Sequence, residues 1–240
     1  MNKLFIIIPT YNEEANIRNI INEWYPIVEK ISSESKLVFI NGKSTDKTLQ
    51  IIQDLSKKYL QLQVLDKPEL KHGPALLFGY AYAIEQKADF IFQTDSDGQT
   101  NPEEFWPFWE DRVNYDFIIG SRNNRQDGFS RVFVTNILKL FIFLMLKTFV
   151  KDANTPFRLM NALKLKLYLD YIPNDFSLAN VLITAIAVKR KEKIKWKNIT
   201  FKPRQGGVNS IDLTKIFFIG LKAIKDFRVF IKNNKNLFIK

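Results

Sequence analysis

Two carboxylates, Asp95 and Asp97, stand one residue apart where the apolar run Phe90–Phe92 ends. Side chains at this spacing can converge on one hard divalent cation, and Mg²⁺ or Mn²⁺ prefers oxygen ligands of this kind. Gln99 adds a neutral oxygen two residues further on. A solvated acidic turn is the alternative, and the triplet alone favours it. With its flanking segments, the pattern predicts a Mg²⁺ or Mn²⁺ site held by Asp95, Asp97 and Gln99.

The flanking segments place the acidic pair on a loop between a strand and a helix. Asn101 is a preferred N-cap residue, Pro102 suits the first helical position and Glu104 suits the third. Because an apolar run precedes the pair, Asp95 and Asp97 are expected at the carboxyl end of a strand, where open α/β sheets bind ligands.

The composition excludes several kinds of site. The 240 residues include no cysteine, so neither a disulfide framework nor a zinc–thiolate site is possible, and the single His72 argues against a histidine-based metal site or relay. The formal net charge of +11 favours an anionic partner, such as nucleotide phosphates or a lipid surface, with compositional drift as the alternative. No aromatic and basic motif for nucleic acid is present, so we expect no nucleic-acid partner.

Strand and helix patterns alternate through the first half of the chain, which predicts an α/β fold with a mostly parallel sheet flanked by helices. The length suits one such domain, which we place at residues 1–210, followed by a C-terminal amphipathic segment at 211–240. The expected strands are Leu4–Ile8, Leu37–Ile40, Leu62–Leu65, Phe90–Phe92 and Phe117–Ile119, and the expected helices are Glu13–Lys30, Ser44–Tyr59 and Pro74–Gln86.

Polar clusters follow four of these strands, so the fold would gather them on one rim of the sheet. Helix capping uses the same residue types and is the alternative for each cluster alone. Neither a dinucleotide-binding glycine fingerprint nor a P-loop is present. The four clusters are Pro9–Glu14, Asn41–Ser44, Asp95–Asp97 and Gly120–Arg122.

These segments resemble the family 2 glycosyltransferases of GT-A (Rossmann-like) fold, and within them the dolichyl- or polyprenyl-phosphate sugar transferases. The likeness covers roughly residues 4 to 215. The opening strand and loop at 4–16 match those of the family. Asp95–Gln99 followed by Pro102-Glu103 matches the family's D-A-D-x-Q-x-P-E segment, and Ile119–Arg122 matches its G-S-R. Asp152–Arg158 resembles its D-x-x-x-G-F-R, and Phe201–Ser210 resembles its R-x-x-G-x-S.

The resemblance implies a metal-dependent inverting transfer of a sugar from a nucleotide-diphosphate sugar to a polyprenyl phosphate. It assigns Asp97 and Arg122 to catalysis. It also assigns donor binding to Pro9, Tyr11, Glu13, Asn41, Asp95 and Asp97, and acceptor phosphate binding to Arg122, Arg131 and Arg204.

Two segments depart from the family pattern. Where the family carries V-D-D-G-S, this chain has Ile40–Ser44 with Gly42 in place of the second, base-reading Asp. The family's Gly-rich segment is reduced to His72–Ala75 and Gly79. The base of the donor nucleotide therefore stays open.

The acceptor decides whether a general base is needed. A phosphate monoester, with a second pKa near ~6, is already a nucleophile at neutral pH, whereas a sugar hydroxyl needs a base. Asp175, in an expected loop, is the one candidate base that we find in the second half, so a phosphate acceptor is favoured. A glycan hydroxyl acceptor and a non-catalytic family member stay as alternatives.

We expect the protein on the cytoplasmic face of a membrane as a peripheral protein. We find no secretory signal, and the longest apolar run, Leu140–Leu146, is far short of the roughly 20 residues that a spanning helix needs. Val132–Val150 and Ile211–Lys232 carry apolar residues at helical spacing with interspersed cations, as interfacial helices do. Ordinary core-facing helices are the alternative.

Overall fold

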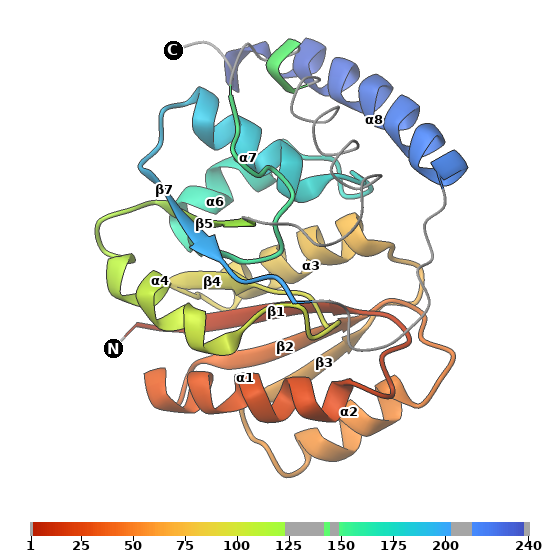
Figure 1. Cartoon of the computed structure of the whole chain (residues 1–240), viewed down its shortest axis with the longest axis vertical. Coiled ribbons are helices and arrows are strands. Elements are labelled where there is room, and N and C mark those ends of the chain that lie inside the picture. The colour runs from red at the N-terminus through yellow and green to blue at the C-terminus, as the bar shows by residue number, and fades with distance from the viewer. Residues whose placement is uncertain (1, 123–141, 145–148, 203–212, 238–240) are drawn as a thin grey trace.

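The computed structural model describes residues 2–122, 142–144, 149–202 and 213–237. Within these ranges a seven-stranded sheet has the strand order β3-β2-β1-β4-β6-β5-β7, and helices cover both of its faces (Figure 1). The strands are β1 (Leu4–Thr10), β2 (Lys36–Asn41), β3 (Leu62–Asp66), β4 (Phe90–Gln93), β5 (Phe117–Arg122), β6 (Arg158–Asn161) and β7 (Ile194–Ile199).

The predicted mostly parallel sheet flanked by helices is confirmed. β1 pairs in parallel with β2 and β4, β2 with β3, and β5 with β7, whereas β6 runs antiparallel between β4 and β5. The helices are α1 (Ile17–Ile31), α2 (Thr48–Ser56), α3 (His72–Glu85), α4 (Phe105–Asp111), α6 (Ala162–Leu169), α7 (Ala179–Lys189) and α8 (Leu213–Asn233), with 3₁₀ turns η1 (Pro102–Glu104) and η2 (Lys235–Leu237).

The central strand β1 divides the core into two layers. Phe5 and Ile7 are buried in the cluster that includes α3, α6 and α7, and Leu4, Ile6 and Ile8 are buried in the cluster that includes α1 and α4. Because side chains alternate along a strand, a strand covered on both faces is apolar throughout. β1 is therefore an interior strand of the sheet, between β2 and β4, and its carboxyl end lies beside the loops that follow these two neighbours.

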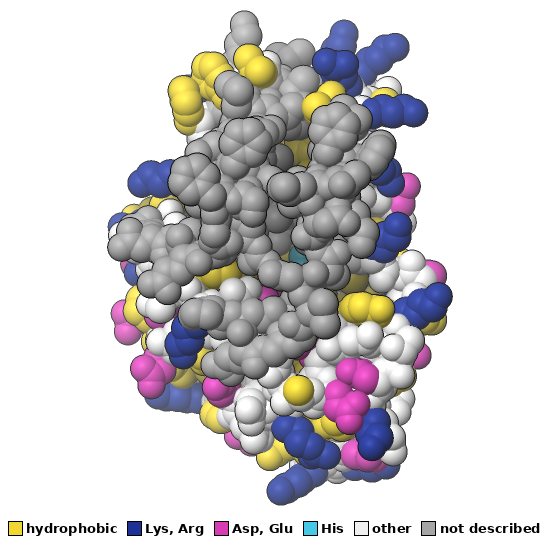
Figure 2. Space-filling view, turned by 45° about the vertical axis from the view of Figure 1, so that its right-hand side comes forward, with side chains coloured by type: hydrophobic (Ala, Val, Ile, Leu, Met, Phe, Trp, Pro, Cys, Tyr) yellow, Lys and Arg dark blue, Asp and Glu magenta, His cyan; other side chains and the backbone are white. Residues whose placement is uncertain are grey.

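The C-terminal helix α8 packs on the body of the protein. Phe227 and Phe230 are buried, and both rings contact Phe176, with centroid distances of 5.3 Å and 6.1 Å. Lysine and arginine side chains gather over the end of the molecule where α8 lies (Figure 2). Among the side chains of α8 that the structure describes, the exposed cations are Lys222, Lys225, Arg228 and Lys232.

No described helix is both long and apolar enough to cross a bilayer. Most of the predicted helix Val132–Val150 lies outside the described residues. Of its described part, Ile142 and Val150 are buried, whereas Leu144 and Phe149 are exposed.

Candidate donor and metal site

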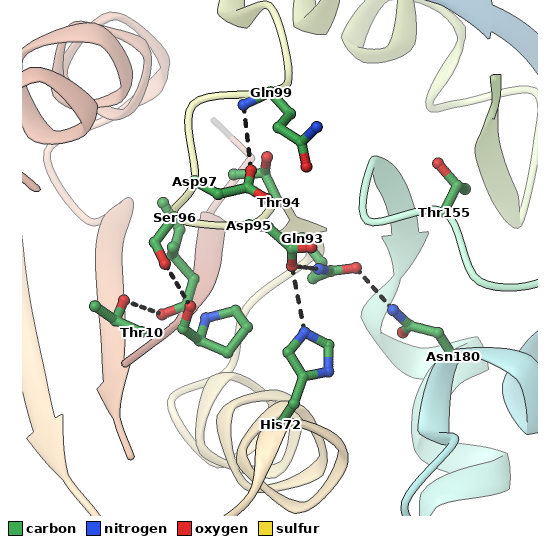
Figure 3. Close-up of polar contacts among 12 residues, drawn as sticks. Thr10, His72, Gln93, Thr94, Asp95, Ser96, Asp97, Gln99, Thr155 and Asn180 are labelled. Carbon is green, nitrogen blue, oxygen red and sulfur yellow. Dashed lines mark hydrogen bonds and ion pairs between the residues drawn. The ribbon is translucent and has the colours of Figure 1, made fainter. Parts of the chain in front are cut away.

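The loop after β4 presents the two carboxylates, Asp95 and Asp97, at the edge of the sheet. The Ser96 hydroxyl donates to the Pro9 carbonyl oxygen at 3.1 Å, which ties this loop to the end of β1 (Figure 3). The Asp97 Oδ1 atom accepts the Gln99 backbone N–H at 3.2 Å, and Gly98 between them has φ of 70°, a conformation that glycine adopts without strain. The loop is thus a tight turn with both carboxylates partly exposed.

The predicted helix start after the loop is confirmed. The Asn101 side chain accepts from the Glu103 backbone N–H, with Pro102 at the first position of η1, which leads into α4. Inside the turn, the hydroxyls of Thr94 and Thr100 lie 2.8 Å apart in a hydrogen bond. These local bonds fix the backbone of the loop that carries Asp95 and Asp97.

Asp95 is held through one of its two oxygens. Gln93 Nε2 donates to Asp95 Oδ1 at 3.1 Å, and His72 Nε2 lies 3.4 Å from the same oxygen (Figure 3). Desolvation alone would lower the pKa of His72, but the hydrogen bond to Asp95 and the charges of Asp95 and Asp97 raise it on balance. The sequence predicts no role for His72 in the site, although this residue opens the reduced Gly-rich segment.

The donor set fits a metal that arrives with its substrate. Among the described residues no group of three or more His, Cys, Asp or Glu side chains could hold a metal ion. Two carboxylates are nevertheless the usual protein share of a Mg²⁺ site, since substrate phosphates and water complete the octahedron. Gln99, the third predicted ligand, donates its Nε2 to the Lys202 carbonyl oxygen at 2.9 Å, so its Oε1 is the atom left to meet a metal.

The loops after β1 and β2 are joined into one platform. Asn12 Oδ1 accepts the Thr45 backbone N–H at 2.8 Å, and the Ser44 hydroxyl accepts the Asn12 N–H at 3.0 Å. The Glu13 N–H donates to the Thr48 hydroxyl at 2.8 Å. The expectation that the polar clusters share one rim is therefore met for these two loops.

Three predicted donor-binding residues lie on this platform with different degrees of exposure. Tyr11 is 58% exposed, so its ring can stack on a base, whereas Glu13 is buried and its Oε2 accepts from Asn16 Nδ2 at 3.0 Å. Asn41 is buried at the end of β2, where its Nδ2 donates to Asp66 Oδ1 at 2.7 Å. The Asn41 Oδ1 atom finds no partner among the described residues, which leaves it as an acceptor at the predicted base site.

The missing family carboxylate has a steric cause. A Cβ atom at Gly42 would lie 2.8 Å from the Leu70 carbonyl oxygen, because the chain after β3 packs against this backbone. That distance is shorter than any ordinary contact, so neither Asp nor Ala fits there without backbone movement. Asp66 at the end of β3 accepts from Asn41, the residue before Gly42, and so places a carboxylate in this part of the rim.

Arg122 is bound by a carboxylate that the sequence pattern did not pair with it. Its Nε and Nη2 atoms donate to Asp152 at 2.8 Å and 2.9 Å, and its guanidinium lies 5.1 Å from the Phe201 ring centroid. The geometry is bidentate, which orients the guanidinium strongly. The other predicted acceptor-binding residues, Arg131 and Arg204, lie outside the described residues.

The comparisons with known proteins identify the family. The model of glycosyl transferase family 2 matches residues 5–163, so the chain belongs to this family. The undecaprenyl-phosphate 4-deoxy-4-formamido-L-arabinose transferase of Pseudomonas fluorescens is 23% identical over 57% of this chain and 40% of its own length. A dolichyl-phosphate beta-glucosyltransferase of Trichomonas vaginalis is 27% identical over 41% of this chain and 30% of its own.

The solved structures confirm the GT-A fold. Glucosyl-3-phosphoglycerate synthase from Mycobacterium tuberculosis, solved with Mn²⁺, uridine-diphosphate-glucose and phosphoglyceric acid, matches with a TM-score of 0.69 at 18% identity. The match covers 95% of this chain and 79% of that one. The chain spans less than half of the length of the two curated relatives described above.

Proposed function

We propose that the protein transfers a sugar from a nucleotide-diphosphate sugar to a polyprenyl phosphate, with inversion and with Mg²⁺ or Mn²⁺. The observation that carries this proposal is the pair Asp95 and Asp97, held partly exposed on a closed loop at the carboxyl edge of a GT-A sheet. The names of the two curated relatives, both lipid-phosphate sugar transferases, support the lipid acceptor.

Each part of the rim has a distinct task in this proposal. Tyr11 and Asn41 bind the base, while Pro9 at the end of β1 and Glu13 in the following loop shape that end of the site. Asp95, Asp97 and Gln99 Oε1 hold the cation on the diphosphate. When bound, the cation supplies positive charge that stabilises the leaving nucleotide diphosphate.

The transfer itself is a displacement at the anomeric carbon. A phosphate oxygen of the acceptor forms the new bond to this carbon as the bond to the β-phosphate oxygen breaks, and no proton has to be removed from a dianionic phosphate. Arg122, with Arg131 and Arg204, binds the acceptor phosphate. Asp152 orients Arg122 for this task, because a bidentate pair restricts the plane of the guanidinium.

A glycan hydroxyl is the second candidate acceptor. Asp175 is exposed in the loop before α7, and the next residues, Phe176 and Ser177, pack so closely on Gly73 that a Cβ atom there would collide with their carbonyl oxygens. This contact brings the Asp175 loop to the start of α3, beside His72. A carboxylate in that place could serve as a general base for a hydroxyl acceptor.

A transfer assay with both acceptors tests the proposal. A panel of nucleotide sugars is offered with undecaprenyl phosphate or with an oligosaccharide, with Mn²⁺ or with chelator, and the products are separated by extraction into organic solvent. We expect a lipid-linked sugar that forms only with Mn²⁺. The Asp97→Asn variant should lose transfer by several orders of magnitude and keep the wild-type unfolding temperature, because the side chain lies on a loop outside the core.

The result also decides between the alternatives. A product on the oligosaccharide alone would move the assignment to the hydroxyl acceptor. No transfer and no metal-dependent hydrolysis of any donor would indicate a family member without catalytic activity. Full activity of the Asp97→Asn variant in chelator would contradict the metal assignment.

A further inference from the structure

A buried chain of side-chain hydrogen bonds ends on Asp95. The Tyr80 hydroxyl donates to Asn180 Oδ1 at 2.9 Å, Asn180 Nδ2 donates to Gln93 Oε1 at 3.0 Å, and Gln93 Nε2 donates to Asp95 Oδ1 at 3.1 Å. Tyr80, Gln93 and Asn180 are at most 2% exposed. Figure 3 shows the last two bonds running from α7 across the end of β4 to the acidic loop.

The direction of every bond in this chain is set by Asp95. An ionised carboxylate only accepts hydrogen bonds, so the amide nitrogen of Gln93 must face it and the amide oxygen must face away. That oxygen requires a donor, which is the nitrogen of Asn180, and the oxygen of Asn180 in turn accepts from Tyr80. Neither amide can be rotated by 180° without placing two donors or two acceptors together.

A buried arginine fixes the middle of the chain. Arg158 pairs with Gln93 across β6 and β4, and its Nη1 donates to the Asn180 carbonyl oxygen at 3.2 Å and to the Thr184 hydroxyl at 3.0 Å. Among the described residues the acceptors of Arg158 are all neutral oxygens, including the Ala153 and Thr155 carbonyls. The first turn of α7 is therefore held against β4 by the side chain that ends the D-x-x-x-G-F-R-like segment.

The charge of Arg158 also acts on the site. Burial lowers the pKa of Arg158 to about 10, while the nearby carboxylates Asp152 and Asp95 act to raise it. A group with this pKa stays protonated at neutral pH. The positive charge of Arg158 and the carboxylate of Asp95 therefore attract each other across the hydrogen-bonded side chains.

We infer that Gln93 and Asn180 are positioning residues that aim Asp95 at the metal-bound diphosphate. Gln93 holds Oδ1 from the protein side, and the described hydrogen bonds of Asp95 all use Oδ1, which leaves Oδ2 for the cation. Residues that hold a metal ligand from behind in this way typically contribute about 10–100-fold to metal affinity or activity. The inference rests on the proposed function, since it assigns a metal to Asp95.

The test removes the side-chain hydrogen bonds between Tyr80 and Asp95 in two stages, so that their effect on metal affinity can be told apart from their effect on stability. Gln93→Met leaves the Asn180 amide without its acceptor, so the unfolding temperature should fall by roughly 2–10 °C. The triple variant Tyr80→Phe, Gln93→Met, Asn180→Leu removes every partner together, and replacing both partners of a buried bond by apolar groups can be nearly neutral. The unfolding temperature should therefore recover.

Metal affinity should not recover with stability. Binding of Mn²⁺ to the whole 240-residue chain is measured by electron paramagnetic resonance of the free ion in the presence of a saturating nucleotide. The nucleotide is UDP, GDP or CDP, chosen as the one that raises the wild-type unfolding temperature most. We expect about tenfold weaker Mn²⁺ binding in both Gln93→Met and the triple variant. Tyr82→Phe is the matched control, because Tyr82 lies on the same helix and donates an equal 2.9 Å bond to Gln63 Oε1, away from this chain.

The outcomes separate the inference from the proposed function. Wild-type Mn²⁺ affinity in the triple variant, with a stable fold, would show that the chain is structural only and would overturn the inference while leaving the function in place. Equal losses in Tyr82→Phe and the triple variant would also overturn it. A wild-type protein that binds Mn²⁺ with none of the three nucleotides would overturn both.

Discussion

Replacing Phe227 by Ala tests whether α8 belongs to the folded body or serves a membrane. Phe227 is fully buried, and its ring packs edge-on against Phe176, with centroids 5.3 Å apart and planes at 68°. Truncating a buried Phe to Ala costs about 3–5 kcal/mol, which includes the cavity left behind. For a chain of this size each kcal/mol lowers the unfolding temperature by about 2–4 °C, so we expect a fall of roughly 6–20 °C.

The matched control lies two residues away on the same helix. Val229 is 51% exposed, so Val229→Ala should change stability by less than about 0.5 kcal/mol. Thermal unfolding without lipid, followed by circular dichroism, compares the two variants. Co-sedimentation with anionic vesicles is measured in parallel, and it should be unchanged by Phe227→Ala at temperatures where the variant is folded.

The opposite pattern would refute this reasoning. If Phe227→Ala unfolds at the wild-type temperature and loses vesicle binding, the apolar face of α8 inserts into lipid rather than packing on Phe176. With the helix packed as described, attachment depends on the exposed cations Lys222, Lys225 and Arg228. Each is worth about 1 kcal/mol near an anionic surface, and salt screens this term. Vesicle binding should then disappear at high ionic strength.

Two further predictions concern single side chains. Gly42→Asp restores the family carboxylate, but its Cβ would press on the Leu70 carbonyl oxygen. The unfolding temperature should therefore fall by several degrees, and the affinity for the donor should not rise. Tighter nucleotide binding by this variant in a titration would contradict the prediction. Burial would raise the pKa of Glu192, but the hydrogen bonds from Tyr168 and Lys164 lower this pKa on balance. The ionised Glu192 therefore stabilises the fold above about pH 4.5, and this contribution is lost as the pH falls further. Glu192→Gln should therefore be less stable than the wild type at pH 6, and the difference should shrink in acid unfolding curves below pH 4.5.

The strands that were predicted correctly from the sequence are those whose own residues form a short apolar run, without reference to contacts elsewhere in the fold. Each of the five expected strands has a structured counterpart within three residues at either end, because a short apolar run between polar segments suits a buried parallel strand. β6 was not predicted: it has four residues, and it begins with Arg158, whose charge is accommodated in the core by carbonyl oxygens and by the Thr184 hydroxyl.

Helix starts were predicted too early where two loops bind each other. The helix expected from Glu13 begins at Ile17, since the Glu13 and Glu14 N–H groups donate to Thr48 and Asp46 of the other loop. The helix expected from Ser44 begins at Thr48 for the same reason. Local propensity cannot reveal such exchanges, because each donor and its acceptor are more than 30 residues apart.

The two carboxylates of the candidate site, identical in a sequence motif, differ in how the fold restrains them. Asp95 is held through Oδ1 by Gln93, whose orientation depends on Asn180, a residue 87 positions further along the chain. Asp97 accepts from the Gln99 N–H within its own turn. A carboxylate fixed by the core has a set position. We therefore expect Asp95 to determine where the cation lies when the donor binds.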